Sequence, residues 1–427
     1  MRAIFGAIIA FFGLNIEFLM ARNMGRVIAS LTENYDYFPL MSLNAFNLWW
    51  IIAKAHGMQV SDKLLAIGIT NAKTVGLLLF SSSYLFAVLR QLFIRRDLAK
   101  TQGLSFGNSM VNLPHKSVDT SIKTFIEGLI IANASFFLFQ TQSHDRYAFP
   151  VSVFLLLWVP FILRQKVNGP SAPSISLGTS SLRTSKWQKG DFIFPISYFL
   201  FTIFYFYNLH TALIFNYPLN GFPILSALTN PIYTLLTSVV LIGLFIFFLF
   251  FIAKRSHWII SIIPIVVFIS LLTAKNLPLI QKKPVSLTKL TPYVSEQEYG
   301  RPVMNMPVGA QFAINKQSFL SDQYAFYRTG IGTHARSFFN YDIGGHFRRL
   351  TTDYGIDTEA GDKGTVIFEI YGDGKLLHRS PIQGRFTLPG HADIDISGVK
   401  ILGLIVTDSG DGNNDDHADW LMPTLWP

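Results

Sequence analysis

Long apolar segments dominate the first two thirds of this chain. Residues 232–253, for example, contain no charged side chain, and a helix needs roughly 17–25 apolar residues to cross a bilayer. The predicted spans lie near residues 3–20, 74–94, 122–140, 149–164, 192–208, 232–253 and 257–274, and Pro160 is expected to bend the fourth. We therefore predict a polytopic α-helical membrane region of about seven spans, in which Glu17 and Glu127 face the interior of the bundle.

The composition changes towards the C-terminus. Over the whole chain, 50% of the residues are hydrophobic and only 14% are charged, whereas a soluble domain carries about a quarter charged residues. From about residue 315 onward the chain is mixed and rich in Asp and Gly. We predict three parts: a membrane region at 1–275, an extracytoplasmic linker at 276–314 and a soluble domain at 315–427. The chain has no cysteine, which excludes disulfides, thiolate metal sites and cysteine nucleophiles.

The Lys and Arg residues behind the net charge of +9 gather in short loops between the apolar segments. Basic loops follow the second, fourth and sixth predicted spans, whereas residues 209–231 contain no Lys or Arg. Because cytoplasmic loops are enriched in these residues, we predict a cytoplasmic N-terminus and an extracytoplasmic C-terminal domain. The basic residues within 21–63 run against this orientation, but acidic residues are mixed with them. Membrane topology thus accounts for the charge, and we do not expect nucleic acid as a partner.

The C-terminal part changes to a period of two. In "GTVIFEIYGDGKLL", residues Val366, Phe368 and Ile370 share one face, and a turn is expected at Gly372–Asp373–Gly374. The segment "ADIDISGVKILGLIVTDSG" supplies two more strands. Short strands separated by glycine turns predict an all-β sandwich of antiparallel strands.

The segment "SLNAFNLWW" lies at the predicted outer edge of the membrane. Asn44 and Asn47 are spaced three residues apart, so they would share one face of a helix. Trp49 and Trp50 are typical of an interfacial belt. A plain interfacial anchor is therefore the alternative to a functional site.

A second outer segment, "QSHDRYAFP", places His144, Asp145 and Arg146 at the mouth of a predicted span. Ionisable residues at this position are either ordinary loop residues or part of a functional site. In the functional interpretation, Arg146 would bind an anionic headgroup with its forked guanidinium. His144 or Asp145 would then bind or orient the same group.

In this order, "NAFNLWW" and "HDRYAFP" resemble segments of the polytopic GT-C glycosyltransferases, in particular the mannosyltransferase-like bacterial branch. The resemblance covers roughly residues 1–275 and implies inverting transfer of a sugar from a polyprenyl-phosphate donor outside the cytoplasm. It assigns catalytic roles to Asn44, Asn47, His144, Asp145 and Arg146. However, Asp145 stands where the family has Glu, and no acidic catalytic loop precedes Asn44. The chain thus resembles the C-terminal part of such an enzyme, which predicts a missing N-terminal part or partner chain.

The C-terminal part resembles the NPCBM-type carbohydrate-binding module over about residues 315–427. The segments that carry the resemblance are "YRTGIGTHARSFFNYDIGGHFRRLTTDYGID", "GTVIFEIYGDG" and "IDISGVKILGLIVTDSGDGNNDDHADWLMP". The resemblance implies a β-sandwich that binds sugars such as galactosides, commonly with a bound calcium ion.

Sugars are recognised by an aromatic platform and by fixed polar groups that bind hydroxyls. The candidates for these roles are His334, Asp416, His417 and Trp420. In the alternative, His334 is a core histidine and Trp420 packs inside the sandwich. Calcium prefers hard oxygen ligands, for which the candidates are Asp408, Asp411, Asn413 and Asp415. These residues lack EF-hand spacing, so a solvated acidic turn remains the alternative.

Three hypotheses for the whole chain follow. The leading one is a glycosyltransferase-like membrane protein whose carbohydrate-binding domain holds a glycan near the membrane site. The second is a non-enzymatic membrane anchor for a glycan-binding domain, which the missing acidic loop favours. A transporter is weaker, because the sequence has no inverted repeat and no pair of broken helices.

Overall fold

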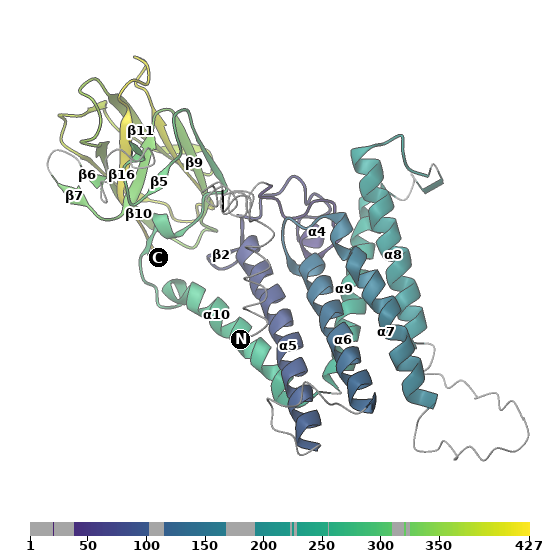
Figure 1. Cartoon of the computed structure of the whole chain (residues 1–427). Coiled ribbons are helices and arrows are strands. Elements are labelled where there is room, and N and C mark those ends of the chain that lie inside the picture. The colour runs from purple at the N-terminus through teal and green to yellow at the C-terminus, as the bar shows by residue number, and fades with distance from the viewer. Residues whose placement is uncertain are drawn as a thin grey trace, which may run out of the picture. The chain divides into compact units, whose positions relative to one another are not determined.

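The computed structural model describes residues 20, 38–101, 115–167, 193–222, 224–225, 229–254, 256–309, 320–321 and 325–427. The order of elements changes at Ile280: the long elements before it are helices, and those after it are strands (Figure 1). Apart from Met20, the first predicted span, which includes Glu17, lies outside the described residues.

The long helices are α5 (Ala72–Thr101), α6 (His115–Phe139), α7 (Phe149–Val167), α8 (Ile193–Asn216), α9 (Pro231–Ala253) and α10 (Trp258–Ile280), preceded by the short α4 (Leu48–Ile52). Within the described part of the chain, five of them are long and apolar enough to cross a membrane, namely all but α7. The predicted span near 149–164 does form a helix, with Pro160 inside it. Seven spans are therefore not confirmed, but the five that are found match five of the predicted positions.

Local sequence explains where α9 and α10 begin. The Asn230 side chain accepts a hydrogen bond from the backbone N–H of Ile232, and Pro231 follows it in the first turn. His257 caps α10 in the same way. These caps satisfy backbone N–H groups that have no partner within the helix.

The interior of the helical region is largely apolar but also holds buried polar side chains, among them Glu127, which is 1% exposed. Helix α6 packs against α5 and α7, and Ile131, Phe137 and Leu138 on it are fully or almost fully buried. The prediction that Glu127 faces the interior is confirmed. Its carboxylate lies 2.6 Å from the guanidinium of Arg90 on α5.

The C-terminal part is a sandwich of two six-stranded sheets, and its paired strands are antiparallel. One sheet has the order β14-β10-β16-β8-β5 with β3 on β16, and its strands are β3 (Val285–Ser286), β5 (Val303–Met304), β8 (Gly330–His334), β10 (Arg349–Ile356), β14 (Gly390–Asp395) and β16 (His417–Trp426). The other has the order β12-β11-β15-β9-β4 with β13 on β11, and its strands are β4 (Val294–Gln297), β9 (Ser337–Asp342), β11 (Thr365–Gly372), β12 (Lys375–Arg379), β13 (Gln383–Gly384) and β15 (Ile401–Thr407). Two small hairpins are β1 (Leu65–Ile67) with β2 (Thr70–Asn71), and β6 (Leu320–Ser321) with β7 (Phe326–Tyr327).

The alternation predicted for "GTVIFEIYGDG" is confirmed. Val366, Phe368 and Ile370 are fully buried between the sheets. The turn after β11 has positive φ at Asp373 (48°) and Gly374 (82°), which suits the right-handed twist of the two strands it joins.

The structure corrects the predicted linker at 276–314. Helix α10 continues to Ile280, and β3, β4 and β5 lie inside the predicted linker. They pair with β16, β9 and β8 respectively, so the sandwich begins near Val285 rather than at residue 315. Strands of two to four residues are too short to show a recognisable alternation in the sequence. Their stability comes from pairing with strands far along the chain, which the local sequence does not reveal.

The strand register gives the sandwich two ends. At the end we call the tether end, Val285 of β3 lies opposite Leu425, shortly after α10 ends. At the end we call the far end, His417 begins β16 and lies opposite His334. The chain therefore enters the sandwich at one end of β16, and the predicted histidines lie at the other.

Candidate functional site

Three aromatic rings meet at the far end. The centroids of the His334 and His417 rings are 5.3 Å apart, because these residues are direct partners on neighbouring strands. The ring of Tyr299 lies 5.0 Å from that of His334 and 6.4 Å from that of His417. His334 is 5% exposed, as the alternative of a core histidine held, whereas Tyr299 is 47% exposed, so the cluster leads from the interior to the surface.

The hydrogen bonds of the two imidazoles fix where their protons lie. Nδ1 of His334 is 2.6 Å from the carbonyl oxygen of Ala335, which can only accept, so Nδ1 carries the proton. Burial lowers the pKa of His334, which keeps its Nε2 an acceptor at neutral pH. His417 Nδ1 lies 2.9 Å from Oε1 of Glu359. The far end thus combines two imidazoles with a tyrosine ring, an arrangement that offers ring faces and hydrogen-bonding nitrogens to a ligand.

Two members of this cluster were not predicted. Tyr299 lies in the segment expected to be a linker, and its sequence context carries no signal for it. Glu359 follows β10 and is brought to His417 by the fold. The pairing of β8 with β16 places His334 beside His417, and the pairing of β10 with β16 brings the segment that contains Glu359 to the same end.

The structure corrects the predicted platform. Trp420 is 0% exposed, and its ring packs edge-on against Phe368, with centroids 4.9 Å apart. Trp420 therefore belongs to the core, as the alternative held, and is not available to stack on a sugar. Asp416, also predicted to bind sugar, is 0% exposed and accepts a hydrogen bond from the backbone N–H of Thr365.

Burial is the main reason why the pKa of Asp416 is raised to about 7, and Asp411, Asp408 and Asp415 add to it. The folded state then holds a proton that the unfolded chain, with a pKa of about 4, has lost. This contribution to stability is full below about pH 4 and is lost as the pH rises through about 7. Between these values we expect the free energy of unfolding to fall by up to about 1.4 kcal/mol per pH unit.

Hydrogen exchange of the sandwich strands from pH 4 to 8, corrected for intrinsic exchange rates, measures this slope. Asp416→Asn should flatten it, since an amide does not titrate in this range. Asp395→Asn is the control, because Asp395 is exposed and lies at the tether end. An unchanged slope in Asp416→Asn would contradict the assignment.

The predicted calcium ligands face different partners. Asp408 Oδ2 lies 3.1 Å from Nη2 of Arg336, Asp411 accepts from the Thr365 hydroxyl, and Asn413 donates to Glu298. In the described residues, no group of three or more His, Cys, Asp or Glu side chains is placed to hold a metal ion. Asp415 follows this loop with a positive φ of 65°. Calcium binding by these residues stays a prediction.

The segments that contain Asn44 and His144 lie side by side in the helical region. His144 forms isolated β-bridges with Leu43 and Asn44, and a short 3-10 helix, Asp145–Ala148, follows it. Burial raises the pKa of Asp145, whereas burial and then Arg146 lower that of His144. Arg146 itself is exposed.

Asn44 and Asn47 have structural roles in this arrangement. Asn47 accepts from the N–H of Trp50 at the start of α4, and its amide donates to carbonyl oxygens of α6 and the following loop. Asn44 precedes the helix with a positive φ of 60°, and its carbonyl accepts from Asn208. The expectation that both share one helix face is therefore wrong, because the helix begins only at Leu48.

The similarities to known proteins that we found all lie in the C-terminal sandwich. Residues 283–426 match the family model of the NPCBM/NEW2 domain, which spans β3 to β16. The C-terminal sandwich is similar to NPCBM/NEW2 domains, and we refer to it as the NPCBM-type domain. The match confirms this part of the sequence resemblance and agrees with a domain that begins before residue 315. A search of curated proteins found no match to the chain.

Several solved structures are similar to the NPCBM-type domain, each over 34% of this chain. A CBM51 from Clostridium perfringens GH95, in complex with methyl-galactose, is 26% identical and is covered over 99% of its length, with a TM-score of 0.30. CBM51-2 with INT domains of Clostridium perfringens ZmpB, in complex with GlcNAc, is 26% identical and covered over 31%, with a TM-score of 0.30. The tandem CBM51 modules of the family 98 glycoside hydrolase Sp3GH98 from Streptococcus pneumoniae SP3-BS71 are 19% identical and covered over 46%, with a TM-score of 0.31.

Proposed function

We propose that this protein binds glycans at the far end of its NPCBM-type domain, and that its helical region anchors it in a membrane. The observation that carries the first part is the cluster of His334, His417 and Tyr299. It combines ring faces with fixed hydrogen-bonding groups, which is the chemistry that sugar recognition needs. The family match to residues 283–426 supports the same function.

The five long apolar helices and the basic loops support the membrane part of the proposal. With the N-terminus in the cytoplasm, the domain after α10 lies outside, where a cell meets extracellular glycans. A lipid bilayer and a glycan are then the two partners of the chain, and a non-enzymatic anchor would need no others.

We expect His417→Ala to weaken glycan binding about tenfold or more, because a hydrogen-bonding nitrogen and a ring face are lost together. Binding of labelled methyl-galactose, GlcNAc and an oligosaccharide panel to intact cells that express the full chain measures both affinity and orientation. His346→Ala is the matched control, since His346 is exposed and follows β9 near the tether end.

Wild-type affinity in His417→Ala would contradict this site. If the purified full chain bound but intact cells did not, the orientation would be wrong. If neither bound any glycan of the panel, the proposed function would fail.

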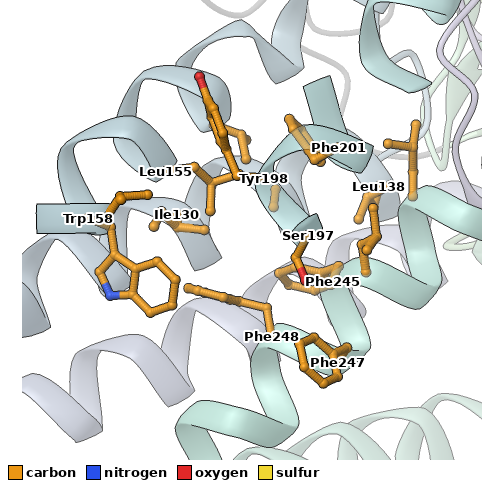
Figure 2. Close-up of a pocket in the computed structure, with 15 residues that line it drawn as sticks. Ile130, Leu138, Leu155, Trp158, Ser197, Tyr198, Phe201, Phe245, Phe247 and Phe248 are labelled. Atoms are coloured by element: carbon orange, nitrogen blue, oxygen red, sulfur yellow. The ribbon is translucent and has the colours of Figure 1, made fainter. Parts of the chain in front are cut away.

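A second candidate function is sugar transfer from a polyprenyl-phosphate lipid, as the GT-C resemblance implies. Arg146 supports it, because it is exposed beside His144 and Asp145, where a phosphate headgroup would meet the loop. An apolar pocket lies between α6, α7, α8 and α9, lined by Ile130, Trp158 and Phe201 among others (Figure 2). Phe201 stacks on Tyr205, whose hydroxyl donates to the Arg146 carbonyl, so the pocket and the loop share a contact.

For this candidate we expect Arg146→Ala to reduce transfer at least tenfold, and Arg146→Lys to reduce it as well, because lysine keeps the charge but loses the fork. Sugar transfer from polyprenyl-phosphate donors in membranes, with any N-terminal partner chain co-expressed, is the measurement. Arg348→Ala, an exposed arginine of the sandwich, is the control. Equal transfer by Arg146→Ala and wild type would exclude the phosphate role.

A further inference from the structure

Four large apolar side chains are exposed on two short segments of the sandwich. Phe326 is 76% exposed, Ile382 56%, Phe386 64% and Leu388 68%. We call these four residues the far-end patch. Such groups of exposed apolar residues usually mark a binding surface.

The strand register places the far-end patch at the same end as the histidines. Gly390, where β14 begins, lies opposite Tyr354, and Tyr354 lies opposite Trp420. The residues that precede Gly390 therefore extend past Trp420 towards the His417 end of the sheet. Phe326 lies at this end as well. Its strand partner Ser321 accepts a hydrogen bond from the backbone N–H of Thr358, which follows the end of β10.

The segment 357–362 joins the far-end patch to the histidine cluster. Glu359 in this segment binds His417, as described above. Arg385, next to Phe386, donates to the carbonyl oxygen of Ala360 and lies 3.4 Å from the carboxylate of Asp362. Both segments of the patch are thus fastened to the same loop that holds His417.

The loop around Phe386 is also closed on itself. The Thr387 hydroxyl donates to the Gly384 carbonyl at 2.7 Å and accepts from the Gly384 N–H at 3.0 Å. The Arg385 guanidinium lies 5.9 Å from the centre of the Phe386 ring. Phe386 is therefore presented by a fixed turn, which lowers the entropy that a ligand must overcome on binding.

We propose that the far-end patch is a second sugar subsite, which extends the histidine cluster. A terminal sugar would lie at His334 and His417, and the C–H face of a further sugar of the same oligosaccharide would stack on Phe386. This inference rests on the proposed glycan binding. The exposed carboxylate of Asp362 and the Arg385 guanidinium would meet the hydroxyls of that further sugar.

Two other occupants fit the structure less well. A membrane would meet the tether end, because α10 ends four residues before β3 at the opposite end of the sheet. A stable protein partner needs roughly 800 Å² on each side, contributed by some 20–30 residues, which is far more than a patch of four side chains offers.

The test compares ligand lengths on the purified full chain in detergent. Methyl-galactose and GlcNAc are titrated beside galactose- and GlcNAc-terminated di-, tri- and tetrasaccharides. Phe386→Ala should weaken binding of the longer ligands about two- to twelvefold and leave monosaccharide binding unchanged. Phe386→Trp should bind the longer ligands as tightly as the wild type, because it keeps an aromatic ring at this position. Leu376→Ala is the control, because Leu376 is an exposed apolar residue on β12 away from the patch.

The outcomes separate this inference from the proposed function. If longer ligands bind no better than monosaccharides, or if Phe386→Ala binds every ligand as wild type does, the second subsite is refuted while the histidine site stands. If Phe386→Ala weakens monosaccharides equally, the patch belongs to the first site and the inference is wrong. If the wild type binds no glycan, both proposals fall.

Discussion

Replacing Trp420 by alanine should lower the free energy of unfolding of the sandwich by about 3–5 kcal/mol. The side chain is fully buried between the sheets, against Phe368 and Tyr354, so its removal leaves a cavity that the two sheets cannot close. Any loss of glycan binding in this variant should follow the loss of folded protein. Had Trp420 been a surface platform, binding would fail at unchanged stability.

Hydrogen–deuterium exchange of the full chain in detergent measures this effect, because peptides from β10 and β11 report on the sandwich separately from the helices. Trp426→Ala provides the control on the same strand. Trp426 is 39% exposed and its indole N–H donates to Thr351, so its truncation should cost less than about 1.5 kcal/mol. Equal protection factors in Trp420→Ala and wild type would contradict the packing described here.

Glu127→Leu should destabilise the helical region by about 3–5 kcal/mol, because it leaves the buried guanidinium of Arg90 without its counter-charge. The side chains of Arg90 and Glu127 are 7% and 2% exposed. The Trp158 indole N–H, which donates to Glu127 Oε1 at 3.0 Å, loses its acceptor in the same variant. Three helices, α5, α6 and α7, are therefore affected by one substitution.

Thermal unfolding of the helical region in detergent provides the measurement, with hydrogen–deuterium exchange of α6 peptides as the readout. The double variant Arg90→Leu, Glu127→Leu should be more stable than Glu127→Leu alone, since it also removes the buried guanidinium and leaves only Lys123, which lies 4.0 Å from Glu127 Oε1 in the wild type, without that counter-charge. A single variant as stable as the wild type, or a double variant less stable than the single, would show that the ion pair does not matter.

Periodicity in the sequence predicted the elements that are long enough to display it. The strict alternation in Thr365–Gly372 and the following turn are present as expected, and five helices lie at predicted positions. Strands β3 to β5 were missed because two to four residues gain their stability from partners far along the chain. No pattern within such short segments separates them from a linker.

The site illustrates the same limit. His334 and His417 were predicted from segments that resemble a family, and the structure brings them together. Trp420 occupies a segment with polar neighbours, and its burial is decided by Tyr354 and Phe368 on other strands. The acidic loop suggested a metal site, but Arg336, which binds Asp408, comes from another part of the chain.

The position of β3 determines how the sandwich bears mechanical load. A glycan held at His417 and pulled away from the helices would exert force along β16, while the chain holds Val285 at the other end of that strand. Hydrogen bonds between antiparallel strands lie perpendicular to the strand axis. The load therefore shears the bonds between β3 and β16 together, instead of opening them one after another as a zipper would. The attachment resists tension best in the direction in which a captured glycan pulls.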